Sequence, residues 1–351
     1  MSNSTPLSLP IPLIGAVGSP YTRKMLSLLR YRRIPHTMIW GDPSAVLDSM
    51  GINKPKIPFL PTFIFEDDKG KQQAVCDSTP IIYRLEELHQ PRSVIPDDPA
   101  LAFINFLLED FGDEWCTKFM FHYRWYYSQD ADNAGNQLPL TMDVTLANDT
   151  LQRFKTFFSE RQIGRLGYVG SNDTTAPIID ASYRRLLSLL EKHFENLPFL
   201  LGEKPSSADF ALFGQLSQLI GFDPTPRAIA YEVSPRSVGW VGTLEDQSGL
   251  NAEQKNWTSL ESLPATVKDI LTEVGRTYVP ALLANAEALA AGEKQWKTEI
   301  DGCQWSQQSF PYQGKCLQWI NNEYQNLSAT DKQRIDQLIT GTGCEALLSQ
   351  N

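Results

Sequence analysis

Ser19, Pro20, Tyr21 and Thr22 lie where a short apolar segment gives way to a helical pattern, and Ser19 and Thr22 carry aliphatic hydroxyls. The first turn of a helix presents free N–H groups and the positive end of the helix dipole, which stabilise an anion such as a thiolate. Cysteines at positions 19 and 22 would make a disulfide-exchange motif, but hydroxyls cannot form the mixed disulfide. Ser19 can instead donate a hydrogen bond to a thiolate that a ligand carries in. The alternative is that Ser19 only caps the helix, the commoner role of serine there.

Two later segments carry groups that can hold a ligand. Leu60-Pro61 begins a predicted strand, where a cis peptide bond would expose the backbone groups of Leu60, and Pro58 is a competing candidate for such a bond. Asp77 and Ser78 stand just before a helical pattern, where free N–H groups and a hydroxyl can hold a carboxylate. Either residue is equally suited to serve only as a helix cap.

Short elements must position these residues. The apolar patterns predict strands at 13–17, 36–40, 61–65 and 73–76, helices at 21–31 and 80–87, and a short helix or loop at 45–50. The last two strands are joined by a charged turn at 67–70, which is typical of a hairpin. The order indicates a small but complete α/β domain over residues 11–92.

The rest of the chain is predicted to be mostly helical. One long helix is expected over 100–127, interrupted only by Gly112, followed by a polar loop at 129–146. Further helices are expected at 148–163, 178–195 and 207–221, the last opened by a capping box at 206–209. A polar section covers 223–262. A helix at 264–292, a hairpin about 301–302 and helices near 314–326 and 329–340 complete the chain, the last opened by Ser328.

Composition limits the class of protein. A chain of 351 residues with 42% hydrophobic residues is long enough for two domains, or for one with a large appendage. A net charge of −10 would repel phosphate backbones and anionic lipid, so a nucleic-acid-binding face is not expected. Five scattered cysteines fit neither a disulfide framework nor a zinc site. With no apolar run near the roughly 18 residues of a membrane span and no signal-like N-terminus, we expect a cytoplasmic protein.

The motifs in this order and spacing resemble the glutathione transferase family over roughly residues 11–245. The resemblance is carried by Ser-Pro-x-x at 19–22, Leu60-Pro61, Asp77-Ser78 before an Ile-Ile-Tyr-x-Leu helix, and Pro-Ser-Ser-Ala-Asp-Phe-Ala-Leu-Phe at 205–213. It implies a thioredoxin-like α/β N-terminal domain and an all-α glutathione transferase C-terminal domain. The expected divisions are a glutathione-binding domain at 1–92, a helical domain at 93–245 that forms the electrophile pocket, and a mainly helical extension at 246–351, packed on the helical domain.

The resemblance also implies roles for single residues. Ser19 is then the hydroxyl that faces the glutathione sulfur, and Leu60 pairs with the cysteinyl backbone. Asp77 and Ser78 hold the γ-glutamyl end, and Lys56, with Lys54 as its rival, meets the glycyl carboxylate. Tyr21 and Pro61 complete the implied glutathione-binding set, which includes no metal ligand.

Two clusters on the predicted 100–127 helix have competing interpretations. Tyr123 and Trp125 are expected to wall the electrophile pocket, and Arg124 to bind an anionic substrate group; the alternative is aromatic packing between helices, with Arg124 reaching solvent. The carboxylates at 109, 110, 113 and 114 are interpreted as a solvated face.

Two functions remain at this point. The first is a glutathione transferase of the serine type, a homodimer active in detoxification, in which glutathione as co-substrate attacks a small hydrophobic electrophile. The second is a non-catalytic glutathione transferase-like binding or scaffold protein, suggested by about a hundred C-terminal residues beyond the usual family length. The sequence does not identify the electrophile or the reaction subtype.

Overall fold

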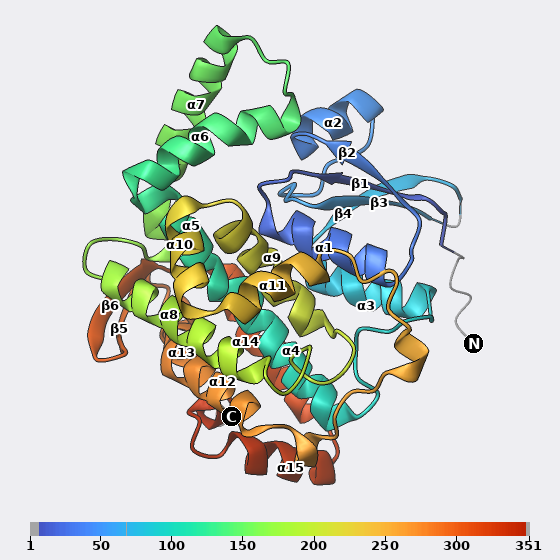
Figure 1. Cartoon of the computed structure of the whole chain (residues 1–351), viewed down its shortest axis with the longest axis vertical. Coiled ribbons are helices and arrows are strands. Elements are labelled where there is room, and N and C mark those ends of the chain that lie inside the picture. The colour runs from blue at the N-terminus through green and yellow to red at the C-terminus, as the bar shows by residue number, and fades with distance from the viewer. Residues whose placement is uncertain (1–6, 68, 349–351) are drawn as a thin grey trace.

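The computed structural model describes residues 7–67 and 69–348, and its first part is a four-stranded sheet with helices on both faces (Figure 1). The elements are β1 (Ile11–Gly15), α1 (Pro20–Tyr31), β2 (His36–Trp40), α2 (Pro43–Met50), β3 (Thr62–Glu66), β4 (Gln72–Cys76) and α3 (Ser78–Leu88). The strand order is β2-β1-β3-β4, with β1 parallel to β2 and the other pairs antiparallel. This confirms the predicted thioredoxin-like α/β domain, called the N-terminal domain below.

Alternating side chains fix the two faces of this sheet. Ile14 and Ile64 pack with Leu47 of α2 on one face. Leu13 and Phe63 point the other way, into the main core that α1 and α3 share with the rest of the chain. Because successive strand residues face opposite sides, one sheet serves both cores. In Figure 1, α2 covers the outer face, and α1 and α3 lie between the sheet and the remaining helices.

A helical domain follows, as predicted for the fold class, although two expectations within it were wrong. Its helices are α4 (Pro99–Glu114), α5 (Cys116–Tyr126), α6 (Ser128–Met142), α7 (Asn148–Ile163), α8 (Ala176–His193), α9 (Ser207–Gly221), α10 (Pro224–Val233) and α11 (Pro235–Leu244), with a 3₁₀ turn η1 (Leu166–Val169). The predicted single helix over 100–127 is broken at Trp115, not at Gly112. The predicted loop at 129–146 is mostly helix α6, and α10 and α11 lie in the section expected to be polar.

Packing between helices explains these two differences from the prediction. An added Cβ on Gly112 would stand 3.1 Å from both the Ala211 Cβ and the Leu212 backbone nitrogen, so this glycine permits close contact of α4 with α9 instead of ending a helix. Helix α6 packs along α7, which has no fully buried residue, and the two stand apart as a hairpin in Figure 1.

The last hundred residues form a third part, called the extension below. It contains η2 (Ala252–Gln254), η3 (Leu260–Ser262), α12 (Ala265–Glu273), a π-turn η4 (Val274–Tyr278), α13 (Val279–Ala290), β5 (Gln295–Ile300), β6 (Cys303–Gln308), α14 (Pro311–Gln325), α15 (Ala329–Ile339) and η5 (Cys344–Leu347). Helix α12 packs on α8, and both α14 and α15 pack on α4. The β5–β6 hairpin turns at Asp301 and Gly302, both of positive φ.

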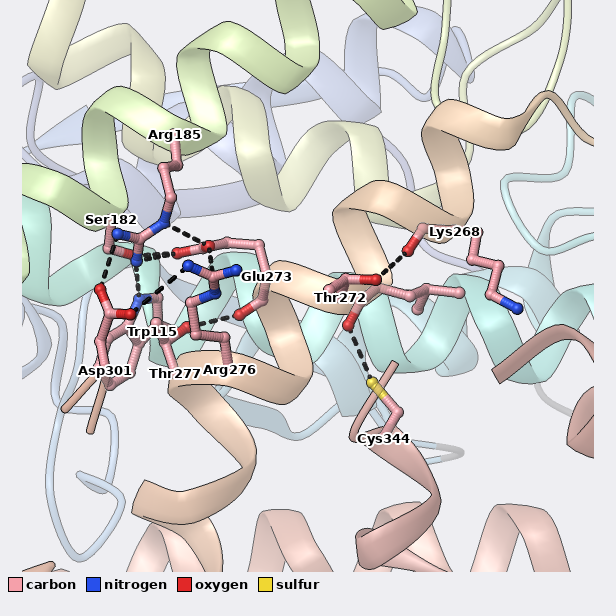
Figure 2. A network of polar contacts seen from close by, with 11 residues as sticks. Trp115, Ser182, Arg185, Lys268, Thr272, Glu273, Arg276, Thr277, Asp301 and Cys344 are labelled. Atoms are coloured by element: carbon pink, nitrogen blue, oxygen red, sulfur yellow. Dashed lines mark hydrogen bonds and ion pairs between the residues drawn. The ribbon is translucent and has the colours of Figure 1, made fainter. Parts of the chain in front are cut away.

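A buried carboxylate joins the extension to the helical domain (Figure 2). Glu273, at the end of α12, accepts hydrogen bonds from the Ser182 hydroxyl at 2.6 Å and from Arg185 Nε at 2.8 Å. Ser182 in turn accepts a bond from Trp115 Nε1 at 3.1 Å, and Arg185 also reaches Asp301 in the hairpin turn at 2.7 Å. One network therefore connects α4–α5, α8, α12 and the hairpin.

The structure bears on two expectations drawn from composition, which concern the cysteines and membrane spans. All five cysteines are free thiols. Within residues 7–67 and 69–348, no helix is long and apolar enough to cross a membrane.

Candidate functional site

Ser19 lies at the N-cap of α1, directly after the loop that leaves β1. Its Oγ accepts a hydrogen bond from the Thr22 backbone nitrogen at 3.2 Å, so the capping role is confirmed. A hydroxyl that accepts in this way still has its own hydrogen to donate. No protein acceptor for that hydrogen is found in the described part of the chain, and the side chain is half-buried. Capping and donation to a ligand are therefore compatible at Ser19.

Thr22 has a different role, because its side chain bonds to the backbone of the loop before α1. Its side chain is fully buried, and its Oγ1 accepts a hydrogen bond from the Ala16 backbone nitrogen at 3.3 Å. Of the two hydroxyls in the motif, Ser19 is the one that a ligand can reach.

Side chains of the helical domain donate hydrogen bonds to the backbone carbonyl groups of the turn before Ser19. Arg124 Nη1 donates to the Gly18 carbonyl at 2.8 Å, and Gln218 Nε2 donates to the Val17 carbonyl at 3.2 Å. Arg124 is only 3% exposed, and its Nε lies 2.9 and 3.0 Å from the two carboxylate oxygens of Asp223. The alternative that Arg124 reaches solvent was therefore wrong, because the side chain is buried between the two domains.

Sheet topology brings the other predicted residues to the same end of the sheet. Ile14 of β1 is opposite Thr62, and Thr62 is opposite Cys76 of β4. The residues just beyond these pairs, Pro61 and Asp77, therefore flank the end of β1 from which the chain runs to Ser19. The Leu60–Pro61 bond is cis, and the bond before Pro58 is trans.

Asp77 and Ser78 are already occupied by protein groups. Asp77 has a φ of 91°, and its Oδ1 accepts a hydrogen bond from the Tyr312 hydroxyl of α14 at 3.0 Å. Burial raises the pKa of Asp77, which the bond from Tyr312 partly offsets. Ser78 Oγ lies 3.2 Å from Lys24 Nζ. Neither contact could be found from the motif, since the partners are far away in sequence.

Lys24 is the centre of a buried ionic cluster that the sequence did not indicate. Its Nζ lies 2.8 Å from Glu109 Oε1 and 2.6 Å from Asp113 Oδ2, and its side chain is fully buried. Burial lowers the pKa of Lys24, but the two carboxylates raise it further, so the net shift is upward and the lysine stays charged. Glu109, Asp113 and Glu114 are at most 9% exposed. The interpretation of these carboxylates as a solvated face was therefore wrong.

The Tyr21 side chain contacts the helical domain. Its hydroxyl donates to the backbone carbonyl of Asp113 at 2.8 Å, and burial raises its pKa well above the usual value. The two lysines before β3 differ in their ion pairing. Lys54 is paired with Asp48 at 2.7 Å, while Lys56 is exposed and has no ion-pair partner among the described residues.

Tyr123 and Trp125 are packed inside the helical domain. Tyr123 is fully buried and donates to Asp180 at 2.6 Å. Trp125, 3% exposed, belongs to a cluster with Phe222, which also lines an open cleft of about 430 Å³ between α6, α9 and α10. Their assignment to an electrophile pocket stays a prediction. No group of His, Cys, Asp or Glu in the described chain is arranged to hold a metal ion.

Two family models match parts of the chain. A family model described as the glutathione S-transferase N-terminal domain matches residues 13–93, and one described as the glutathione S-transferase C-terminal domain matches residues 173–242. No curated protein matches the chain.

The chain is also similar to solved structures, at low sequence identity. A Tau class glutathione S-transferase from mango, Mangifera indica, is 18% identical with a TM-score of 0.38, covering 67% of this chain and 87% of its own. A glutathione S-transferase from Rhodospirillum rubrum is 16% identical (TM-score 0.40; 71% and 94%). A glutathione transferase family member from Pseudomonas fluorescens, solved with two glutathione molecules bound, is 15% identical (TM-score 0.42; 70% and 93%).

Proposed function

We propose that the chain, which matches models of the glutathione S-transferase N-terminal domain over residues 13–93 and C-terminal domain over residues 173–242, binds glutathione and uses it as a co-substrate. Glutathione would lie at the end of the sheet where Ser19, Leu60-Pro61 and Asp77 gather. The unpaired Lys56 would meet its glycyl carboxylate. The family supports a function that involves glutathione, and the mechanism below is the finer part of the proposal.

One observation carries the mechanism: the Ser19 hydroxyl caps α1 through its oxygen and keeps its hydrogen for a ligand. A sulfur placed at this hydroxyl also faces the first turn of α1, where N–H groups and the helix dipole favour negative charge. Both effects stabilise the thiolate of glutathione relative to its thiol. Each unit by which the thiol pKa falls corresponds to about 1.4 kcal/mol of this preference.

The second substrate would be a small hydrophobic electrophile. Leu138 of α6 lies against the Ser19 turn, so close that an added Cβ on Gly18 would stand 2.1 Å from its Cδ2. This apolar contact suits an apolar reactant beside the sulfur. With an aryl halide, the sulfur–carbon bond forms, the halide leaves with its electron pair, and the thiol proton passes to solvent. Tyr123 and Trp125 would support the pocket, and we expect a metal-free cytoplasmic homodimer.

Calorimetric titration with glutathione and turnover of an aryl halide test this proposal. We expect binding at millimolar glutathione or below, and at least a tenfold lower kcat/KM for Ser19→Ala. Ser328→Ala is the matched control, because Ser328 caps α15 through the same contact, 3.1 Å from the Asp331 nitrogen, in the extension. Both variants lose a cap worth about 1 kcal/mol, but only Ser19→Ala should lose activity. Full turnover by Ser19→Ala would refute the mechanism, and absence of glutathione binding would favour the scaffold alternative.

A further inference from the structure

The first turn of α14 lies against the start of α3 at one end of the candidate site. Tyr312 Oη donates to Asp77 Oδ1 at 3.0 Å, although 235 residues separate the two. The next residue, Gln313, donates from Nε2 to Glu114 Oε2 at 3.1 Å, at the end of α4. The extension therefore contacts both the N-terminal and the helical domain here.

Contacts within the extension hold this turn in place. Asn285 of α13 is fully buried and forms two bonds with the backbone of Phe310, from its Nδ2 to the carbonyl at 3.0 Å and from the Phe310 nitrogen to its Oδ1 at 2.8 Å. Helix α13 continues from the π-turn that follows Glu273, the residue fastened to α8 in Figure 2. The turn that carries Tyr312 is therefore fixed by Asn285 of α13 as well as by the bond to Asp77.

Docking of α14 leaves very little space beside the start of α3. The cavity enclosed there has a volume of about 10 Å³, and its lining consists of Thr79, Phe106, Glu109, Asp110, Asp113, Glu114, Tyr312 and Trp319. A cavity of this size holds one water molecule at most. An amino-acid group of a ligand does not fit between Thr79 and Tyr312 while α14 is docked.

Tyr312 and the γ-glutamyl end of glutathione require the same acceptor. The γ-glutamyl group carries an α-ammonium, and a charged donor forms a stronger hydrogen bond to a carboxylate than a neutral hydroxyl does. Tyr312 is a neutral donor, because burial raises its pKa far above neutrality. Its side chain is only partly buried and packs against the main core, so displacing it exposes less apolar surface than displacing a fully buried ring would.

We propose that Tyr312 is a gate on the glutathione site: its hydroxyl competes with the α-ammonium group of glutathione for Asp77, and the extension keeps this end closed until glutathione displaces it. The inference rests on the proposed function, and it gives the extension a role in regulating that site. Binding of glutathione and docking of the first turn of α14 are then antagonistic.

Glutathione titration of wild type, Tyr312→Phe and Tyr324→Phe tests the gate. Tyr312→Phe keeps the ring but removes the competing donor, so the Kd for glutathione should fall by about tenfold, equivalent to 1.4 kcal/mol. Tyr324→Phe is the control, because Tyr324 bonds to Asp336 at 2.8 Å within the extension, and its Kd should equal that of wild type. Hydrogen exchange of amides 310–316 gives a second measurement, and saturating glutathione should accelerate it in the wild type.

Each result decides between distinct conclusions. An unchanged or raised Kd for Tyr312→Phe would overturn the gate, as would slower exchange of amides 310–316 with glutathione, which would mean that Tyr312 closes onto the ligand. If none of the three proteins binds glutathione at millimolar concentration, the proposed function fails and the gate with it. Binding by Tyr312→Phe alone would support both.

Discussion

Arg124 donates a hydrogen bond of 2.8 Å to the Gly18 carbonyl, one residue before Ser19, from a guanidinium fixed on the buried carboxylate of Asp223. The residue thereby transmits the position of the helical domain to the turn that carries the candidate serine. It touches no reacting atom in our proposal and would act by positioning Ser19.

Arg124→Lys tests this positioning. Arg124 Nη2 also donates to Gln218 Oε1 at 2.8 Å. A lysine keeps the charge beside Asp223 but cannot bond to Asp223, Gln218 and Gly18 together, so the Ser19 turn should loosen. We expect the pKa of the bound glutathione thiol, followed by thiolate absorbance, to rise toward its free value, with about tenfold lower kcat/KM. Arg185→Lys is the control, because Arg185 also bonds to a buried carboxylate, Glu273, and should lose stability without a change in thiol pKa. An unchanged thiol pKa in Arg124→Lys would contradict the positioning role.

Lys56→Ala should weaken glutathione binding. The unpaired ammonium of Lys56 is free to meet the glycyl carboxylate, whereas Lys54 is engaged by Asp48. An exposed ion pair contributes roughly 0.2–1 kcal/mol, so the Kd should rise by a factor of about 1.4 to 5, and less at high salt. Calorimetry at two ionic strengths measures this, with exposed Lys71→Ala as the control. A larger effect of Lys54→Ala than of Lys56→Ala would assign the role to Lys54.

Glu114 makes stability depend on pH. Burial, assisted by nearby Asp110, raises its pKa from an ordinary value of 4.5 to about 8 in the folded protein. The folded state therefore keeps a proton that the unfolded state releases between these values, so this contribution to stability is complete below about pH 4.5 and is lost as the pH rises toward about 8. Its slope is about 1.4 kcal/mol per pH unit at most.

Glu114→Gln should remove that slope while preserving an acceptor for Gln313. Urea unfolding at about pH 5.5 and about pH 7.5 measures the change, and the difference between the two values should be smaller in Glu114→Gln than in wild type. Exposed Glu299→Gln should behave as wild type does. Parallel profiles for wild type and Glu114→Gln would show that the carboxyl is ionised in the folded protein throughout.

Gly275→Ala should loosen the end of the chain. An added Cβ on Gly275 would stand 1.9 Å from the Thr342 carbonyl oxygen, so the π-turn and the segment before η5 must separate. Overpacking of this kind costs about 1–3 kcal/mol. Gly239→Ala, in α11 with no atom within 4 Å of the added Cβ, should instead be neutral or slightly stabilising. Thermal unfolding compares the two, and equal melting temperatures would contradict the expectation.

Local patterns predicted most of the secondary structure because they depend only on residues that are close in sequence. The helix at 207–221 and its capping box, for example, depend on neighbours at Ser206 and Asp209, and both were confirmed. Helix α6 was missed because its asparagine, aspartate, glycine and proline residues are weak helix formers. Its stability comes from distant partners, such as the Thr225 nitrogen, which donates to the buried Asp130 at 2.8 Å.

The site was predictable only where its residues are contiguous. The Ser19 cap follows from a short motif, whereas the sequence left Pro58 and Pro61 as rival candidates for the cis bond that the structure has before Pro61. Burial of Glu109 does not, because Lys24 stands 85 residues earlier in the chain and Tyr278 covers the neighbouring Asp110 from the extension. A charge pattern on one helix cannot show whether a cation from another element will cover it.

Because Asp77 and Tyr312 are far apart in sequence, Asp77 is synthesised well before the tyrosine that bonds to it. At about 5–20 residues per second, the ribosome takes roughly 10–50 s to add the 235 residues between them. During that interval Tyr312 has not yet been synthesised, so Asp77 lacks the donor that we propose competes with glutathione. If glutathione binds as proposed, a nascent chain that takes it up in this interval must release it from Asp77 before Tyr312 can form its bond there.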